Sequence, residues 1–113
     1  MTQQPHWQRP SKVIDEIKRT NLTPDEATRL ANLMDRFASG RTFRKDHCRL
    51  RDGVEELRLD GNHRIFRLYF GRIDSGLVLL MLHFKAKKKD NDRVAIDKAA
   101  DRLKRWRDHP EET

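Results

Sequence analysis

The apolar positions of residues 11–40 follow the 3.6-residue period of α-helices. A short first segment has one apolar side, formed by Val13, Ile14 and Ile17, and Ser11 can cap it. A second segment opens with Thr23-Pro24-Asp25-Glu26, in which a capping threonine, a proline at the first helical position and a glutamate three residues after the cap form a capping box. Its apolar stripe consists of Ala27, Leu30, Ala31, Met34, Phe37 and Ala38. We expect two helices that form an antiparallel hairpin.

After Gly40 the apolar period changes to two, which is typical of strands. In residues 54–60 the two leucines share one face, and Glu56 and Arg58 share the other. Residues 63–72 alternate in the same way, with Arg64 on one side and Arg67 on the other, and residues 77–84 are apolar on both faces. Turn-forming residues lie between these segments, Asp60-Gly61-Asn62 and Asp74-Ser75-Gly76. The pattern predicts an antiparallel meander of three to four strands.

The last periodic segment is helical and runs from Ala95 to Trp106, after a capping sequence at Asp90-Asn91-Asp92. Residues 1–10 follow neither period, so we expect a loose arm there, and residues 109–113 form a tail. The predicted fold is a single α+β domain over residues 1–113: an N-terminal helical hairpin packed on a small antiparallel sheet, with a C-terminal helix.

The charge balance favours a polyanionic partner. The 113 residues include 25 Lys and Arg against 18 Asp and Glu, a formal charge of +7, and hydrophobic residues make up only 35% of the chain. A basic excess of this kind suits nucleic acid, although it also keeps a small domain in solution. The longest apolar run, residues 77–82, is too short to span a membrane, and the polar N-terminus does not resemble a secretory signal. We therefore expect a cytoplasmic protein without a membrane partner.

The sequence offers no pattern of metal ligands. Cys48 is the one cysteine, so no internal disulfide forms, and the five histidines lack the i, i+3 or i, i+4 spacing of a zinc site. We expect neither a metal nor an organic cofactor.

Three groups of cations are candidates for an RNA site. The first is the connector after Gly40, with Arg49 and Arg51, and the second is the set of strand arginines Arg58, Arg64 and Arg67. The third group follows Phe84 directly: Lys85, Lys87, Lys88 and Lys89. Because neighbouring strand ends meet in an antiparallel meander, Arg58, Arg64 and Lys85 are expected at one edge of the sheet, as a patch that fits a phosphate backbone. Alternatively, Arg58 pairs with Glu55 or Glu56 and the lysines are simply solvated.

Such a patch suits RNA cleavage without a metal, in which the ribose 2′-hydroxyl attacks its own 3′-phosphate. Cations stabilise the developing charge, and a lysine crowded by other cations can act as the base. His63 and His83 are rival bases, since histidine titrates near neutrality; His83 is more typical of a core or supporting position. Glu56 is a further candidate base, and a cross-strand partner for an arginine is its commoner role.

Several segments together resemble the RelE/HigB superfamily of toxins, and most closely its phage-derived Gp49-like branch. They are Leu50-Arg51-Asp52-Gly53-Val54-Glu55-Glu56-Leu57-Arg58, His63-Arg64-Ile65-Phe66, Leu79-Leu80-Met81-Leu82-His83-Phe84-Lys85-Ala86-Lys87-Lys88, and Ala99 with Arg102. No single segment is specific; their order and spacing are. The resemblance covers residues 50–102, about half of the chain as motif.

The resemblance implies a toxin of a type II toxin-antitoxin system, an endoribonuclease that cleaves messenger RNA, often on the ribosome, and is neutralised by a cognate antitoxin. It implies Arg58, Arg64, Lys85, Lys87 and Lys88 as catalytic candidates, and we add as RNA-binding candidates Arg49, Arg51, His63, Arg67 and Lys89. Two alternatives stay open: a gyrase-inhibiting relative of the same fold, and a non-catalytic basic module that binds nucleic acid or an antitoxin.

Overall fold

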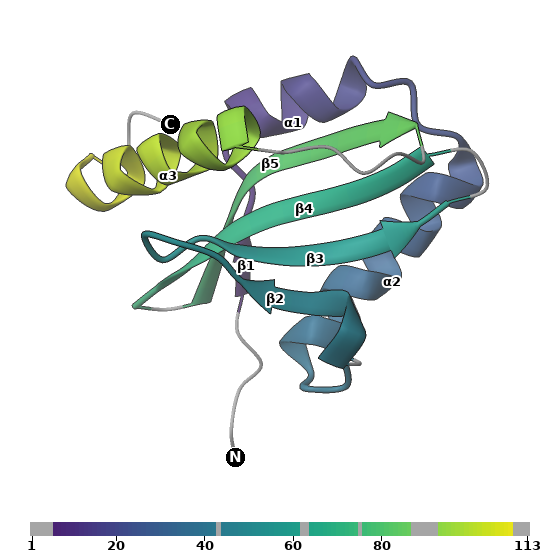
Figure 1. The fold of residues 1–113 in the computed structure, drawn as a ribbon, viewed down its shortest axis with the longest axis horizontal. Coiled ribbons are helices and arrows are strands. Elements are labelled where there is room, and N and C mark those ends of the chain that lie inside the picture. Colours follow the sequence, from purple (N-terminus) through teal and green to yellow (C-terminus); the bar gives the residue numbers. More distant parts are fainter. Residues whose placement is uncertain (1–5, 43, 62–63, 75, 87–92, 110–113) are drawn as a thin grey trace.

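The computed structural model describes residues 6–42, 44–61, 64–74, 76–86 and 93–109, without the side chains of residues 85 and 86. The described elements are β1 (His6–Gln8), α1 (Ser11–Lys18), α2 (Pro24–Ala38), the 3₁₀ turn η1 (Arg44–Asp46), β2 (His47–Arg49), β3 (Glu55–Asp60), β4 (Arg64–Ile73), β5 (Gly76–Ala86) and α3 (Arg93–Asp108). They form an α+β fold with helices on both faces of one sheet (Figure 1).

The sheet of the described residues is five-stranded and mixed, in the order β1-β5-β4-β3-β2. The predicted meander is confirmed for β3, β4 and β5, which pair antiparallel in sequence. The expectation of three to four antiparallel strands holds for β2 to β5 and was wrong at the other edge, where a fifth strand pairs parallel. The basic connector supplies β2, which pairs antiparallel with Glu55 to Leu57 only, and β1 adds a parallel strand on β5.

Strand β1 lies within residues 1–10, where the sequence predicted a loose arm. The backbone of β1 lies so close to Gly76 of β5 that a Cβ atom at this position would clash with the carbonyl oxygen of His6. Trp7 anchors the strand, because its indole N–H donates to the carbonyl of Met34 at 3.0 Å and its ring meets Phe70 edge-on. A three-residue strand has too few positions to show an alternating pattern, so this pairing was not visible in the sequence.

Helices α1 and α2 cover one face of the sheet, but not as the predicted hairpin. Helix α1 lies against β5 and α2 against β3, so each is held by the sheet (Figure 1). The capping box at the start of α2 is confirmed: the Thr23 hydroxyl accepts from the Glu26 N–H, and the Glu26 carboxylate accepts from the Thr23 N–H. Ser11, predicted as a cap, is instead the first residue of α1, whose cap position is Pro10.

The strands alternate between two hydrophobic clusters. Leu57, Leu68, Phe70, Leu77 and Leu79 pack with α1 and α2. The opposite face packs on α3 through Val54, Tyr69, Val78, Leu80 and Met81. This double burial of β5 is what its apolar run predicted, and no helix in the described part of the chain is long and apolar enough to cross a membrane.

Helix α3 covers only one half of its face of the sheet. Its buried residues reach the half that carries Val54 and Tyr69, whereas the half where β3 and β5 end is crossed by none of the described helices on this side (Figure 1). Among the described side chains of that half, Arg58 has 44% of its side chain exposed and Arg67 has 22%.

Candidate nucleic-acid interface

Three basic side chains, two arginines and a histidine, lie next to one another across the half of the sheet that α3 does not cover. Arg58 of β3 is the register partner of Arg67 of β4, and Arg67 is the register partner of His83 of β5. Directly opposed residues of neighbouring strands have their side chains on the same face, about 4.5–5.5 Å apart at Cβ. We call these three residues the cross-strand row.

A second line of residues supports the row from the side of α3. Glu56, Tyr69 and Met81 are register partners, two positions along each strand from the row. The carboxylate of Glu56 lies 3.8 Å from an Arg67 guanidinium nitrogen, so the predicted cross-strand role of Glu56 is confirmed. The ring of His83 stacks on the fully buried ring of Tyr69, with centroids 6.4 Å apart. Packed strands therefore hold Arg67 and His83 in place.

Arg58 is the most accessible member of the row, with 44% of its side chain exposed. Its Nε donates to Asp60 of the same strand at 3.0 Å, and not to Glu55 or Glu56 as the alternative reading of the sequence had it. An exposed pair of this kind contributes little to stability, about 0–1 kcal/mol. The guanidinium of Arg58 can therefore exchange Asp60 for another anion at small cost.

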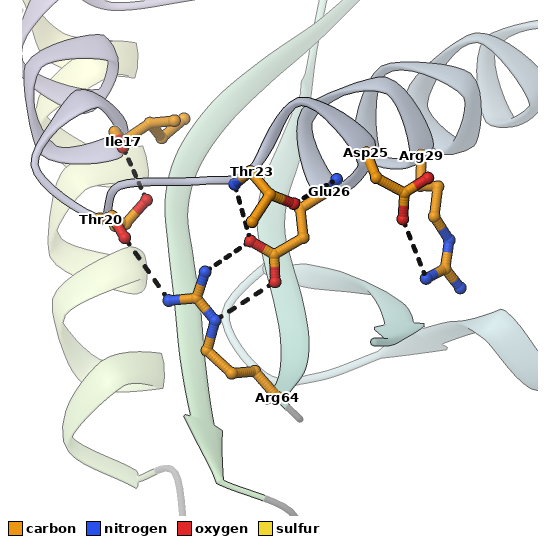
Figure 2. A network of polar contacts seen from close by, with 7 residues as sticks. All are labelled: Ile17, Thr20, Thr23, Asp25, Glu26, Arg29 and Arg64. Atoms are coloured by element: carbon orange, nitrogen blue, oxygen red, sulfur yellow. Dashed lines mark hydrogen bonds and ion pairs between the residues drawn. The ribbon is translucent and has the colours of Figure 1, made fainter. Parts of the chain in front are cut away.

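Arg64 lies on the opposite face of the sheet. Strand alternation separates it from Arg67, and its guanidinium donates to the Glu26 carboxylate at 2.6 Å and to the Thr20 carbonyl at 3.5 Å (Figure 2). The same group lies over the Phe66 and Phe84 rings, at 5.0 and 4.6 Å from their centroids. The hydrogen bond from Arg64 holds the pKa of Glu26 below its ordinary value of 4.5. Arg64 thus connects α2 to the sheet.

The expected patch of Arg58, Arg64 and Lys85 is therefore divided. The three residues do lie at one end of the sheet, since Lys85 pairs with Ile65 and the next residue of β5 pairs with Arg64. Arg58 and Arg64, however, point to different faces, because the end of a strand is shared by both of its faces and the alternation decides which side each residue takes. The remaining candidates His63, Lys87, Lys88 and Lys89, and the side chain of Lys85, lie outside the described part of the structure.

The two candidates in the connector also stand apart from the row. Arg49 is 78% exposed on β2, 4.0 Å from the Glu55 carboxylate. Arg51 pairs with Asp52 at 2.7 Å and with Asp97 of α3. Arg51 therefore ties the turn before β3 to α3, whereas Arg49 presents its charge at the sheet edge.

A buried charge cluster that the sequence did not indicate lies where β2, β3 and β4 meet. Glu55, which is 5% exposed, accepts from His47 at 2.7 Å and from Arg72 at 2.7 Å. The His47 ring also packs on Phe37 and Phe70. Burial by itself raises the pKa of Glu55, but the hydrogen bonds from Arg72 and His47 outweigh it and lower the pKa overall. The sequence signal that could have indicated this cluster is Glu55 itself, an acidic residue on the same inward face of β3 as Leu57.

Acid should destabilise the protein through three paired carboxylates. The hydrogen bond from Arg102 lowers the pKa of Glu16 against the effect of burial, and the pKa values of Glu26 and Glu55 are lowered as well. The unfolded chain then takes up protons at higher pH than the folded one, so this stabilisation is complete above about pH 5 and is lost as the pH falls through the folded values. Melting temperatures from pH 7 to pH 3 should fall below pH 5, and less steeply in Glu16→Gln. A wild-type melting temperature unchanged down to pH 3 would contradict this.

No family model matches the chain, and no curated protein matches it with significance. Within the described residues there is also no group of three or more His, Cys, Asp or Glu side chains that could hold a metal ion.

Proposed function

We propose that the protein is an RNA-cleaving toxin of the type II toxin-antitoxin class, with its site on the uncovered half of the sheet. The observation that carries the proposal is the cross-strand row: Arg58 and Arg67 in register beside His83 on the same face of the sheet. Two guanidinium groups on packed strands suit the paired oxygens of a phosphate, and an imidazole is a side chain that can transfer protons. The resemblance of residues 50–102 to the RelE/HigB superfamily supports the same assignment.

The reaction is a transesterification that needs no metal. A base removes the proton of a ribose 2′-hydroxyl, the 2′-oxygen bonds to the adjacent phosphorus, and the bond from phosphorus to the 5′-oxygen breaks. That 5′-oxygen takes up a proton, so the products are a 2′,3′-cyclic phosphate and a 5′-hydroxyl. Arg58 and Arg67 stabilise the charge that develops on the phosphate oxygens, which is worth about 3–4 kcal/mol for each well-placed donor. His83 and Glu56 are the proton-transfer candidates of the described face.

The lysines at the end of β5 belong to the same proposal. Strands β5 and β3 end at the same end of the sheet, with β4 between them; Lys85 is the second-last residue of β5, and Lys87 and Lys88 follow it in the sequence. Their assigned roles are charge stabilisation and proton transfer, with Lys89 and His63 in RNA binding. Arg64 has no place in the proposed chemistry, because it lies on the face of the sheet opposite the cross-strand row, where its guanidinium donates to Glu26 and Thr20.

The deciding experiment incubates the purified protein with messenger RNA, with and without ribosomes, in the presence of EDTA. We expect cleavage that the chelator does not inhibit, at 3′ ends that carry a cyclic phosphate and become extendable only after phosphatase treatment. Cleavage that EDTA abolishes would refute the metal-independent mechanism. Intact RNA under both conditions would refute the nuclease assignment.

Induction in cells tests the two other classes. Growth arrest with cleaved messenger RNA fits the proposal, growth arrest with trapped gyrase complexes fits a gyrase inhibitor, and unimpaired growth fits a binding module without turnover. A cytoplasmic toxin of this class also needs a cognate antitoxin. We expect that partner to cover the cross-strand row with an acidic or amphipathic segment, so that the complex no longer binds RNA.

A further inference from the structure

The outer edge of β3 is open where Arg58 and Asp60 lie. Strand β2 pairs with Glu55 to Leu57 only, so residues 58–60 have no strand beside them on that side within the described chain. On the helix-covered side of this edge a groove of about 560 Å³ opens between α2 and β3. It is lined by Arg29, Asn32, Asp35, Arg36, Arg41 and Leu59.

This arginine groove is joined to the cross-strand row through a single residue. The guanidinium of Arg29 donates to the backbone carbonyl of Asp60 at 3.0 Å, while the carboxylate of Asp60 accepts from Arg58 at 3.0 Å. One residue at the end of β3 thus contacts a cation from each face of the sheet. An RNA strand that crosses the row and bends around the open edge of β3 therefore meets cations on both faces of the sheet.

The charges in the arginine groove are only weakly neutralised. Three arginines line it against Asp35 alone. Arg36 has no hydrogen-bond partner at Nε, and neither Arg36 nor Arg41 has an ion pair in the described part of the chain. Arg29 is 3.9 Å from Asp25, which is itself 73% exposed and contributes little. This arrangement differs from that of Arg64 and Arg72, whose guanidinium groups are held by carboxylates.

The spacing of the cations favours a chain of phosphates over a single small anion. Arg29 and Arg36 are seven residues apart on α2, which places them on one side of the helix about 10 Å apart along its axis. Arg41 follows the helix end, where its Nε donates to Ser39 at 2.8 Å. Cations distributed along a groove bind successive phosphates and give affinity without sequence preference.

We propose that the arginine groove is a second RNA subsite, which binds the backbone phosphates of nucleotides flanking the one that is cleaved. The inference rests on the proposed RNA-cleaving function and extends it: the groove contributes affinity for longer RNA and takes no part in bond breaking. Arg36 and Arg41 bind phosphate there, and Arg29 links the groove to the row.

The test measures binding of a single-stranded 12-nucleotide RNA whose ribose 2′-positions are all methylated, so that it cannot be cleaved by this route. Affinity is followed by fluorescence anisotropy between 50 and 300 mM salt for the wild type and for Arg36→Gln/Arg41→Gln. We expect the double variant to bind about tenfold more weakly and to lose roughly 1.4 from the slope of log affinity against log salt, which corresponds to two released phosphate contacts. Cleavage of a dinucleotide should be unchanged.

The matched control is Arg9→Gln/Lys18→Gln, which removes the same charge from exposed positions before and at the end of α1. An equal loss of affinity or slope in the control would refute a localised subsite, and so would a variant that binds like the wild type. If the double variant melts far below the wild type, Arg41→Glu at an exposed position replaces it, with weaker binding and an expected loss of roughly 0.7 from the slope for the one contact removed. If the wild type cleaves no RNA but the double variant shows the expected loss of binding, the subsite is retained and the nuclease is rejected. If the wild type cleaves the dinucleotide but the double variant binds RNA as the wild type does, the nuclease is retained and the subsite is rejected.

Discussion

Replacing Arg58 with alanine is expected to lower the rate of RNA cleavage at least about 100-fold, the effect of removing one donor to a charge that develops in the transition state. The melting temperature should change by less than about 3 °C, because Arg58 is exposed and pairs only with Asp60 at the surface. Single-turnover cleavage of a short RNA at saturating protein separates this effect on the chemical step from an effect on binding.

Two variants make the Arg58 result interpretable. Lys18→Ala removes an exposed cation from α1, on the other face of the sheet, and should cleave RNA as the wild type does. Arg58→Lys keeps the charge but loses the planar fork that grips two oxygens, so partial activity is expected. Wild-type rates in Arg58→Ala would remove the cross-strand row from the chemistry.

Replacing Arg64 with methionine is expected to have the opposite profile. The variant loses the hydrogen bonds to Glu26 and Thr20 and leaves the Glu26 carboxylate without its arginine in a partly buried position (Figure 2). We expect the melting temperature to fall by about 5–10 °C, as for other broken charge networks of small domains. Cleavage measured well below the melting temperature should stay within about threefold of the wild type.

A thermodynamic cycle tests the cause of that loss. If Arg64 acts through Glu26, then Glu26→Gln and Arg64→Met should each destabilise the protein, and the double variant should lose less than the sum of the two. Abolished cleavage with an unchanged melting temperature in Arg64→Met would show instead that Arg64 belongs to the site, as the family resemblance implies.

The different expectations for Arg58 and Arg64 arise from the register of the sheet. The alternation of β3 and β4 already assigned Arg58 and Arg67 to the face opposite the leucines, and the structure confirms that pattern. The prediction of one patch failed because it considered only the end of the sheet at which each residue lies. Two residues at the same end can still be separated by the full thickness of the sheet.

Other features depended on pairings between distant segments. The Glu55 cluster brings together His47 and Arg72, and the arginine groove brings α2 beside the open edge of β3. Neither has a local signature, since a buried carboxylate or an arginine-lined groove is defined by what other elements contribute. Strand β1 is a similar case, because its position depends on the missing side chain of Gly76.

By itself the sequence determined the helices, the central strands and the faces on which their residues lie. Burying each large apolar side chain contributes about 1.5–3 kcal/mol, and the spacing of these side chains along the sequence shows which face is buried. The capping box set the start of α2 for an equally local reason. Only the tertiary structure decided which cations are paired and which are accessible. The pairing of these cations depends on contacts between residues far apart in the sequence. Glu26 and Arg64 are 38 residues apart, Glu56 and Arg67 are 11 residues apart, and both pairs form only when the sheet is complete.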